Sequence, residues 1–170
     1  MSFVEADGQK IVLVRAAEAE VLGGGLMTTR LLADSDSTDG AISANRTLLR
    51  QGAGGPPAHY HAGSAEIFFI LGGSLQALAG DRIVKLNEGD FLVIPRHMPH
   101  AFAAPPRADA DVLIIQAPEL KKRFEYLRLA ERAIKGQASP QEILDSQERF
   151  DNHFLDSPIW REARRMEDAR

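Results

Sequence analysis

Hydrophobic and polar positions divide the chain into two parts. From Ile11 to about Pro118, short apolar runs rich in β-branched and aromatic residues are separated by glycine, proline, asparagine and aspartate. Many short runs at this spacing are typical of strands in an antiparallel sandwich or barrel. We therefore predict a β domain over residues 1–118, with strands at residues 11–15, 26–33, 41–50, 66–71, 74–79, 82–86, 91–94 and 111–117 and a turn at residues 71–74.

The pattern changes to helical spacing after Pro118. In residues 119–136 the apolar residues recur every three or four positions, at Phe124, Leu127, Ala130 and Ile134. Ser139 and Glu142 form a capping box that starts a second helix, and Ser157 starts a third in the same way. Because about 50 residues rarely hold a core of their own, we expect residues 119–170 to pack on the barrel or on a dimer partner, which would also cover Trp160.

Composition and charge exclude several classes of protein. The net charge of −4 argues against a nucleic acid or an anionic membrane as partner, since both require a basic surface. With no cysteine, the chain has no disulfide, thiolate metal site or cysteine nucleophile. No apolar run reaches the roughly 18 residues that span a bilayer, and the first residues, MSFVEADGQK, lack the order of a signal peptide. We expect a soluble, cytoplasmic protein.

The segment PAHYHAGSAEIFFILGG carries the candidate chemistry. In a strand, His59 and His61 project to the same face, with Tyr60 on the other, as a chelating pair requires. Imidazole suits several divalent transition metals. The alternative is a pair of surface histidines on a loop.

Glu66 heads the next apolar run. Its parity places Phe68 and Ile70 on its own face, so the carboxylate would lie among large apolar groups. A buried carboxylate without a partner costs several kcal/mol, on the order of a desolvated ion, and a metal would remove that cost. Glu66 could also accept protons near a metal without ligating it.

These residues and a second segment resemble the cupin superfamily. The first motif of that family fits His59, His61, Glu66 and Gly73, with a leading glycine one position out of register. In the second motif Gly89, Pro95 and His100 match, while His97 replaces a glycine and Ala104 replaces an asparagine. The resemblance covers about residues 40–117.

The resemblance implies a double-stranded β-helix of the jelly-roll type, extended here by about three C-terminal helices. It also implies a homodimer and one divalent metal inside the barrel, held by His59, His61, Glu66 and His100. The metal would be iron, nickel, manganese, cobalt, copper or zinc. Single-domain members that are similar to quercetin dioxygenase have this ligand set.

Three hypotheses for function follow. The first is a dioxygenase that acts on an aromatic or enolic small molecule, with Glu66 taking a proton and with Phe68, Ile70 and Phe102 lining the pocket. The second is a lyase, isomerase or cyclase in which the metal is a Lewis acid. The third is a small-molecule-binding protein without catalysis. We interpret His97 as an exposed turn residue and His153 as structural or solvated.

Overall fold

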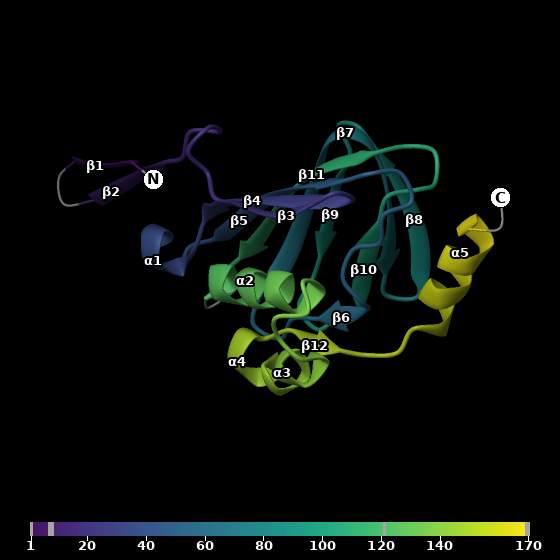
Figure 1. Ribbon diagram of the computed structural model, residues 1–170. Helices are drawn as coiled ribbons and strands as arrows, with labels where there is room; N and C mark the ends of the chain where they lie inside the picture. The colour runs from purple at the N-terminus through teal and green to yellow at the C-terminus, as the bar shows by residue number, and fades with distance from the viewer. Residues whose placement is uncertain (1, 7–8, 121, 169–170) are drawn as a thin grey trace.

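Ten antiparallel strands form the main sheet, which curves into a barrel (Figure 1). The computed structural model describes residues 2–6, 9–120 and 122–168. Within this part of the chain the main sheet has the path β12-β6-β10-β7-β11-β5-β4-β3, and β8 and β9 also pair with β7. The strands are β3 (Val21–Gly24), β4 (Met27–Ala33), β5 (Ser43–Leu49), β6 (His59–Tyr60), β7 (Ala65–Ala79), β8 (Arg82–Asn87), β9 (Phe91–Ile94), β10 (His100–Ala103), β11 (Ala110–Ala117) and β12 (His153–Phe154).

The long strand β7 connects the two sides of the barrel. Its first half pairs with β9 and its second half with β8 and β10, while β11 follows it through a register shift at Asp111 and Val112. The turn predicted at residues 71–74 is therefore wrong. Gly73 instead bends a continuous strand: its φ is 71°, and a Cβ there would collide with the Asp109 carbonyl oxygen.

Side chains alternate along the first half of β7, as predicted. Glu66, Phe68 and Ile70 point inward and are each 1% exposed, whereas Phe69 and Leu71 on the other face are 36% and 38% exposed. Phe68 and Ile70 join a core cluster that includes Leu49, Leu75, Ile94, Phe102, Val112 and Ile114. This alternation is what brings a carboxylate into the barrel.

A small sheet precedes the barrel strands, and a short helix lies between β4 and β5. β1 (Ser2–Ala6) and β2 (Gln9–Leu13) form a separate two-stranded sheet that extends away from the barrel (Figure 1). The short helix α1 (Ser35–Thr38) is capped by Asp34, whose carboxylate accepts a hydrogen bond from the Ser35 amide. The sequence pattern predicted neither α1 nor the strands β1, β3 and β10.

Helices follow β11, as predicted, but the described residues form four of them rather than three. They are α2 (Arg123–Ile134), α3 (Pro140–Asp145), α4 (Gln147–Phe150) and α5 (Pro158–Asp168). The second predicted helix is divided at Ser146 into α3 and α4, and Asp151, left-handed with φ 49°, ends α4. The capping box is present: Ser139 Oγ accepts from the Glu142 amide, and Glu142 Oε1 accepts from the Ser139 amide.

The segment after Pro118 contacts the barrel of its own chain. Helix α2 crosses one end of the barrel and α5 lies beside β8 (Figure 1). Trp160 of α5 packs against Leu78 and three alanines of the barrel, and β12 pairs with β6. On α2 the buried residues are Arg123 and Tyr126, while Ile134 of the predicted apolar stripe is 73% exposed.

The described part of the chain contains no helix with the length and hydropathy to cross a bilayer.

Candidate functional site

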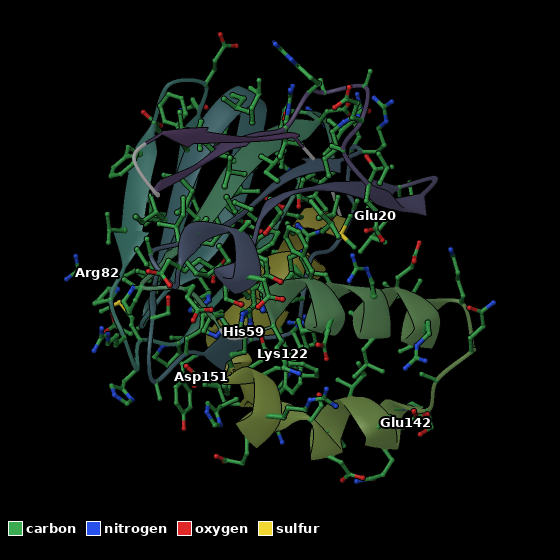
Figure 2. All side chains as sticks on the ribbon, turned by 90° about the vertical axis from the view of Figure 1, so that its left-hand side faces the viewer. Glu20, His59, Arg82, Lys122, Glu142 and Asp151 are labelled. Carbon is green, nitrogen blue, oxygen red and sulfur yellow. The ribbon has the colours of Figure 1, made fainter. Side chains whose placement is uncertain are left out.

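Three histidines and one glutamate gather inside the barrel. His59 comes from β6, His61 from the residues just after it, Glu66 from β7 and His100 from β10. One ligand atom from each lies within 4.8 Å of the others. All four side chains are 1–2% exposed, and His59 lies in the interior in Figure 2. Antiparallel pairing of His59 with His100 brings the two sequence motifs together.

Backbone carbonyl groups orient all three imidazole rings. Nδ1 lies 2.8 Å from the Pro57 oxygen in His59, 2.6 Å from the Asp151 oxygen in His61 and 2.9 Å from the Met98 oxygen in His100. Because a carbonyl oxygen only accepts, each Nδ1 carries a hydrogen and donates it. The lone pair for a metal is then on Nε2, an arrangement typical of metal-ligating histidines.

Two of the three Nε2 atoms lie against the Glu66 carboxylate. Glu66 Oε2 is 2.5 Å from Nε2 of His100 and 3.1 Å from Nε2 of His61. Two lone pairs at such a distance repel each other unless a proton or a metal cation lies between them. The donor set therefore fits a cation.

The ionisation of these groups also suits a metal. Burial raises the pKa of Glu66, but His100 and His61 outweigh it and hold that pKa well below its usual range. Burial, together with His100 and His61, holds the pKa of His59 well below its usual value, so His59 is neutral. Burial lowers the pKa of His100, yet Glu66 outweighs it and the pKa of His100 is raised. Ionised Glu66 and neutral His59 are thus in the forms that ligate metals, whereas on His100 a metal would displace the proton that Glu66 favours, so we expect metal binding to release a proton.

The buried group could hold one metal ion. Three imidazole nitrogens and one carboxylate oxygen suit manganese, iron, cobalt, nickel, copper and zinc.

A buried glutamine supports Glu66 from behind. Gln116 Nε2 donates to Glu66 Oε1 at 3.0 Å, and Gln116 Oε1 accepts from Ser43 Oγ at 2.9 Å. Our sequence analysis did not identify Gln116. The signal was available, because residues 112, 114 and 116 share one face of β11 and only the last is polar.

A cavity of about 310 Å³ lies beside His59 and Glu66. Barrel residues form one side and the segment after Pro118 forms the other, including Arg123, Tyr126, Leu127, Asn152 and Phe154. Of the three residues proposed from the sequence for a substrate pocket, Phe102 lines this cavity. Phe68 and Ile70 do not: they lie in the core, where Phe68 packs edge to face behind Phe102 with 5.4 Å between the ring centres.

Three buried polar atoms of this cavity have no hydrogen-bond partner among the described residues. They are Asn45 Oδ1, Arg123 Nε and Asn152 Nδ2. Leaving a buried polar atom unpaired costs about 1–3 kcal/mol. Such atoms are candidates for contacts with a bound molecule, and the sequence analysis identified none of them.

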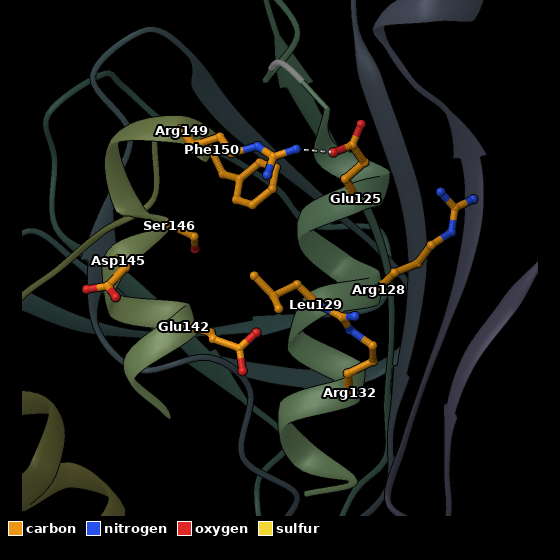
Figure 3. Close-up of a pocket in the computed structure, with 9 residues that line it drawn as sticks. All are labelled: Glu125, Arg128, Leu129, Arg132, Glu142, Asp145, Ser146, Arg149 and Phe150. Carbon is orange, nitrogen blue, oxygen red and sulfur yellow. Dashed lines mark hydrogen bonds and ion pairs between the residues drawn. The ribbon is translucent and has the colours of Figure 1, made fainter. Parts of the chain in front are cut away.

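A larger hollow of about 620 Å³ lies between α2 and α3–α4 (Figure 3). Its charged side chains are exposed, and Arg149 pairs with Glu125 at 2.6 Å. Neither the histidines nor Glu66 line it. We therefore place the site in the smaller cavity.

The remaining histidines lie outside the buried group. His97 is exposed with φ 63°, and its amide donates to the His61 carbonyl oxygen at 2.7 Å. The His153 ring stacks on Tyr60 and lies 2.9 Å from an Asp151 carboxylate oxygen. Both residues thus support the loops around the site.

Comparison with known proteins agrees with this geometry. The cupin domain family model matches residues 45–116. No curated protein sequence matches the chain. The matched residues include strands β6 to β10 and all four members of the buried group.

Solved structures share the fold at low sequence identity. An RmlC-like cupin from Shewanella frigidimarina is 18% identical with a TM-score of 0.56, and the match covers 73% of this chain and 99% of that one. The polyketide cyclase RemF from Streptomyces resistomycificus is 20% identical with a TM-score of 0.54, covering 71% and 95%. The nucleoside dehydratase Pac13 from Streptomyces is 11% identical with a TM-score of 0.52, covering 64% and 83%.

Proposed function

We propose that the protein is a metal-dependent enzyme that transfers a proton on a small carbonyl or enol compound inside the barrel. His59, His61, Glu66 and His100 are its metal ligands. The observation that carries the proposal is the convergence of four buried donor atoms beside a cavity that a small molecule can fill. A bound divalent ion would supply a Lewis acid for an oxygen of the substrate.

The chain's own residues provide the rest of the chemistry. Gln116 fixes Glu66 Oε1, so Oε2 is the oxygen that faces the histidines. With the histidine nitrogens directed at a bound metal, they would no longer pair with Oε2, and a lone pair of this oxygen would accept a substrate proton. Because the walls bury all four donors, water is largely excluded and electrostatic interactions in the site are strong. Proton transfer and return at Oε2 would support elimination, isomerisation or cyclisation without an oxidant.

The polar atoms of the cavity favour this redox-neutral reaction. Arg123, Asn152 and Asn45 supply hydrogen-bonding atoms that suit a polar substrate. A cyclase and a dehydratase among the proteins of similar fold are compatible with it.

A quercetin dioxygenase-like reaction is the second candidate. Three histidines and a glutamate also accept redox-active metals. Phe102 gives the cavity an aromatic wall against which a planar ring could pack. In that case dioxygen would be the oxidant and an aromatic or enolic compound the substrate.

Oxygen uptake separates the two reactions. The metal-free protein would be loaded in turn with manganese, iron, cobalt, nickel, copper and zinc, and assayed with flavonols, catechols, enediols and hydroxy or keto acids. Turnover with zinc in the absence of dioxygen supports the Lewis-acid enzyme. Turnover that consumes dioxygen and fails with zinc supports the dioxygenase. If the metal-loaded protein binds these compounds without converting them, both reactions are contradicted.

Metal content tests the ligand assignment directly. Replacing both His59 and His61 with alanine removes two of the four donors, so we expect bound metal to fall from about one ion per chain to nearly none. Elemental analysis after gel filtration measures this. The matched control is His153→Ala, which removes an imidazole outside the group and should keep the metal. A double variant with full metal content would overturn the assignment.

A homodimer and a cytoplasmic location stay predictions.

A further inference from the structure

Arg123 is a buried cation without a carboxylate partner in the described structure. Its side chain is largely enclosed, with the residue 7% exposed. The guanidinium lies over the Tyr126 ring, 4.9 Å from the ring centre, and Nη1 donates to Asn152 Oδ1 at 3.3 Å. Nε has no acceptor among the described residues, and none of the ion pairs between them includes Arg123.

Asn152 adds a second donor at the same place. A guanidinium has only donors, so the oxygen of the Asn152 amide has to face Arg123. The amide nitrogen, Nδ2, then points elsewhere, and it is buried without a partner. Asn152 is 1% exposed and lines the cavity together with Arg123, His59 and Glu66.

The charges within the cavity leave Arg123 uncompensated. Glu66 is the one carboxylate among the lining residues, and its oxygens already contact His61, His100 and Gln116. A buried cation normally has an anionic partner. A guanidinium is planar and forked, a shape that matches a carboxylate.

We infer that Arg123 and Asn152 bind the carboxylate of the substrate, so that the enzyme acts on a small organic acid. The reaction of that acid at Glu66 rests on the proposed function, whereas its binding at Arg123 does not.

The rest of the cavity is apolar. Met27, Phe102 and Ile114 line it from the barrel, and Leu127 lines it from α2. A second hollow of about 460 Å³ between α2 and β3 shares Met27 and Leu127, so apolar space continues beside the cavity. The acid therefore carries an apolar body, which distinguishes it from acetate or inorganic phosphate.

Calorimetric titration of the purified protein tests this inference, with and without bound metal. The probes are phenylacetate, its neutral amide phenylacetamide, acetate and inorganic phosphate. We expect phenylacetate to bind about tenfold or more tightly than the amide, because only the anion pairs with Arg123. Arg123→Met should weaken phenylacetate binding by about 10- to 100-fold.

Two further variants control for charge and for folding. Arg132→Met removes an exposed arginine of the same helix and should leave phenylacetate binding unchanged. Asn152→Asp places a carboxylate beside Arg123, so it should abolish phenylacetate binding while the thermal midpoint stays the same or rises. Loss of binding in a stably folded protein can then not be ascribed to unfolding.

Several results would overturn the inference. They are equal affinity for phenylacetate and its amide, no binding of phenylacetate by the wild type, tighter binding of inorganic phosphate, or equal losses in Arg123→Met and Arg132→Met. Metal content is measured in the same samples. If the His59→Ala, His61→Ala protein keeps its metal, the proposed function fails while the result at Arg123 stands by itself.

Discussion

The two sides of the cavity differ in the kind of polar atom that they leave unpaired. On the barrel side, each histidine of the buried group donates through Nδ1 to a carbonyl oxygen and both Glu66 oxygens have partners, so the unpaired atom among the described residues is an acceptor, Asn45 Oδ1. On the helical side the unpaired atoms are donors, because Arg123 and Asn152 each keep a buried nitrogen without a partner among the described residues. Under our proposals, the buried group on the barrel side binds a cation, and the unpaired donors on the helical side bind an anionic ligand.

The two sides of the cavity would have different functions, metal binding on the barrel side and substrate binding on the helical side. Three residues of the buried group, His59, Glu66 and His100, lie on strands of the barrel, where pairing in the sheet fixes their side chains, and His61 follows β6 directly. Arg123 and Asn152 come from the segment after Pro118, outside the residues that match the cupin domain. Chemistry shared with a fold family and selection of one substrate can therefore come from different parts of a chain.

The largest expected effect tests whether the barrel side depends on its supporting hydrogen bonds. Gln116→Met keeps a side chain of similar length but removes the donor to Glu66 Oε1. Loss of such a supporting contact typically lowers metal affinity by about 10- to 100-fold, and we expect that range here. Competition with a chelator of known affinity measures it.

The control is Gln76→Met, which changes another buried glutamine of the barrel that does not contact Glu66. It should leave metal affinity within about twofold of the wild type. If both variants lose affinity equally, the effect comes from general destabilisation and Gln116 has no particular role.

The barrel side could largely be predicted from the sequence. Period-two alternation placed Glu66 inside, and the match of His59, His61 and His100 to the cupin motifs identified the rest of the metal-binding group. The alternation is a sound guide here because strand periodicity determines the face on which a side chain lies.

The helical side could not be predicted for a physical reason. Whether an arginine at the start of a helix is buried depends on how that helix packs, and the pairing of Arg123 with Asn152 joins residues 29 positions apart. The turn predicted at residues 71–74 failed for a related reason: two adjacent glycines indicate a bend, but partner strands decide whether the strand ends there.

The next largest expected effect is a loss of stability at Asp151, which joins the helical side to the loop after β6. Asp151 accepts hydrogen bonds from the amides of Ala62 and Gly63, and its own carbonyl oxygen orients His61. Asp151→Asn keeps the size and removes the charge, and we expect it to lower the free energy of unfolding by about 1–2 kcal/mol at pH 7. Urea denaturation measures the loss, and Asp156→Asn, at an exposed position, is the control.

The stabilisation by the Asp151 carboxylate should depend on pH in a definite direction. Burial raises the pKa of Asp151, but the amides of Ala62 and Gly63 outweigh it, so the pKa is lower in the folded protein. The stabilisation is therefore complete above the unfolded pKa of about 3.9 and is lost as pH falls through the lower folded pKa. The difference between wild type and Asp151→Asn should be constant above about pH 5 and shrink below pH 4. A difference that grows with acid would contradict the ionised carboxylate.

The smallest expected effect is a gain in stability on the barrel side. His97 has φ 63°, in the region that glycine adopts without strain, and it stands where the cupin motif has a glycine. Its amide holds the His61 carbonyl oxygen, a contact that any residue except proline can make. His97→Gly should therefore raise the free energy of unfolding by about 0.5–1 kcal/mol, the relief of left-handed strain less the extra chain entropy of glycine. His97→Ala loses the same imidazole but keeps a Cβ, so it should show no gain. Metal content should stay at the wild-type level in both variants. Equal urea midpoints for the two variants would mean that the imidazole ring, and not the backbone conformation, determines the stability at this position.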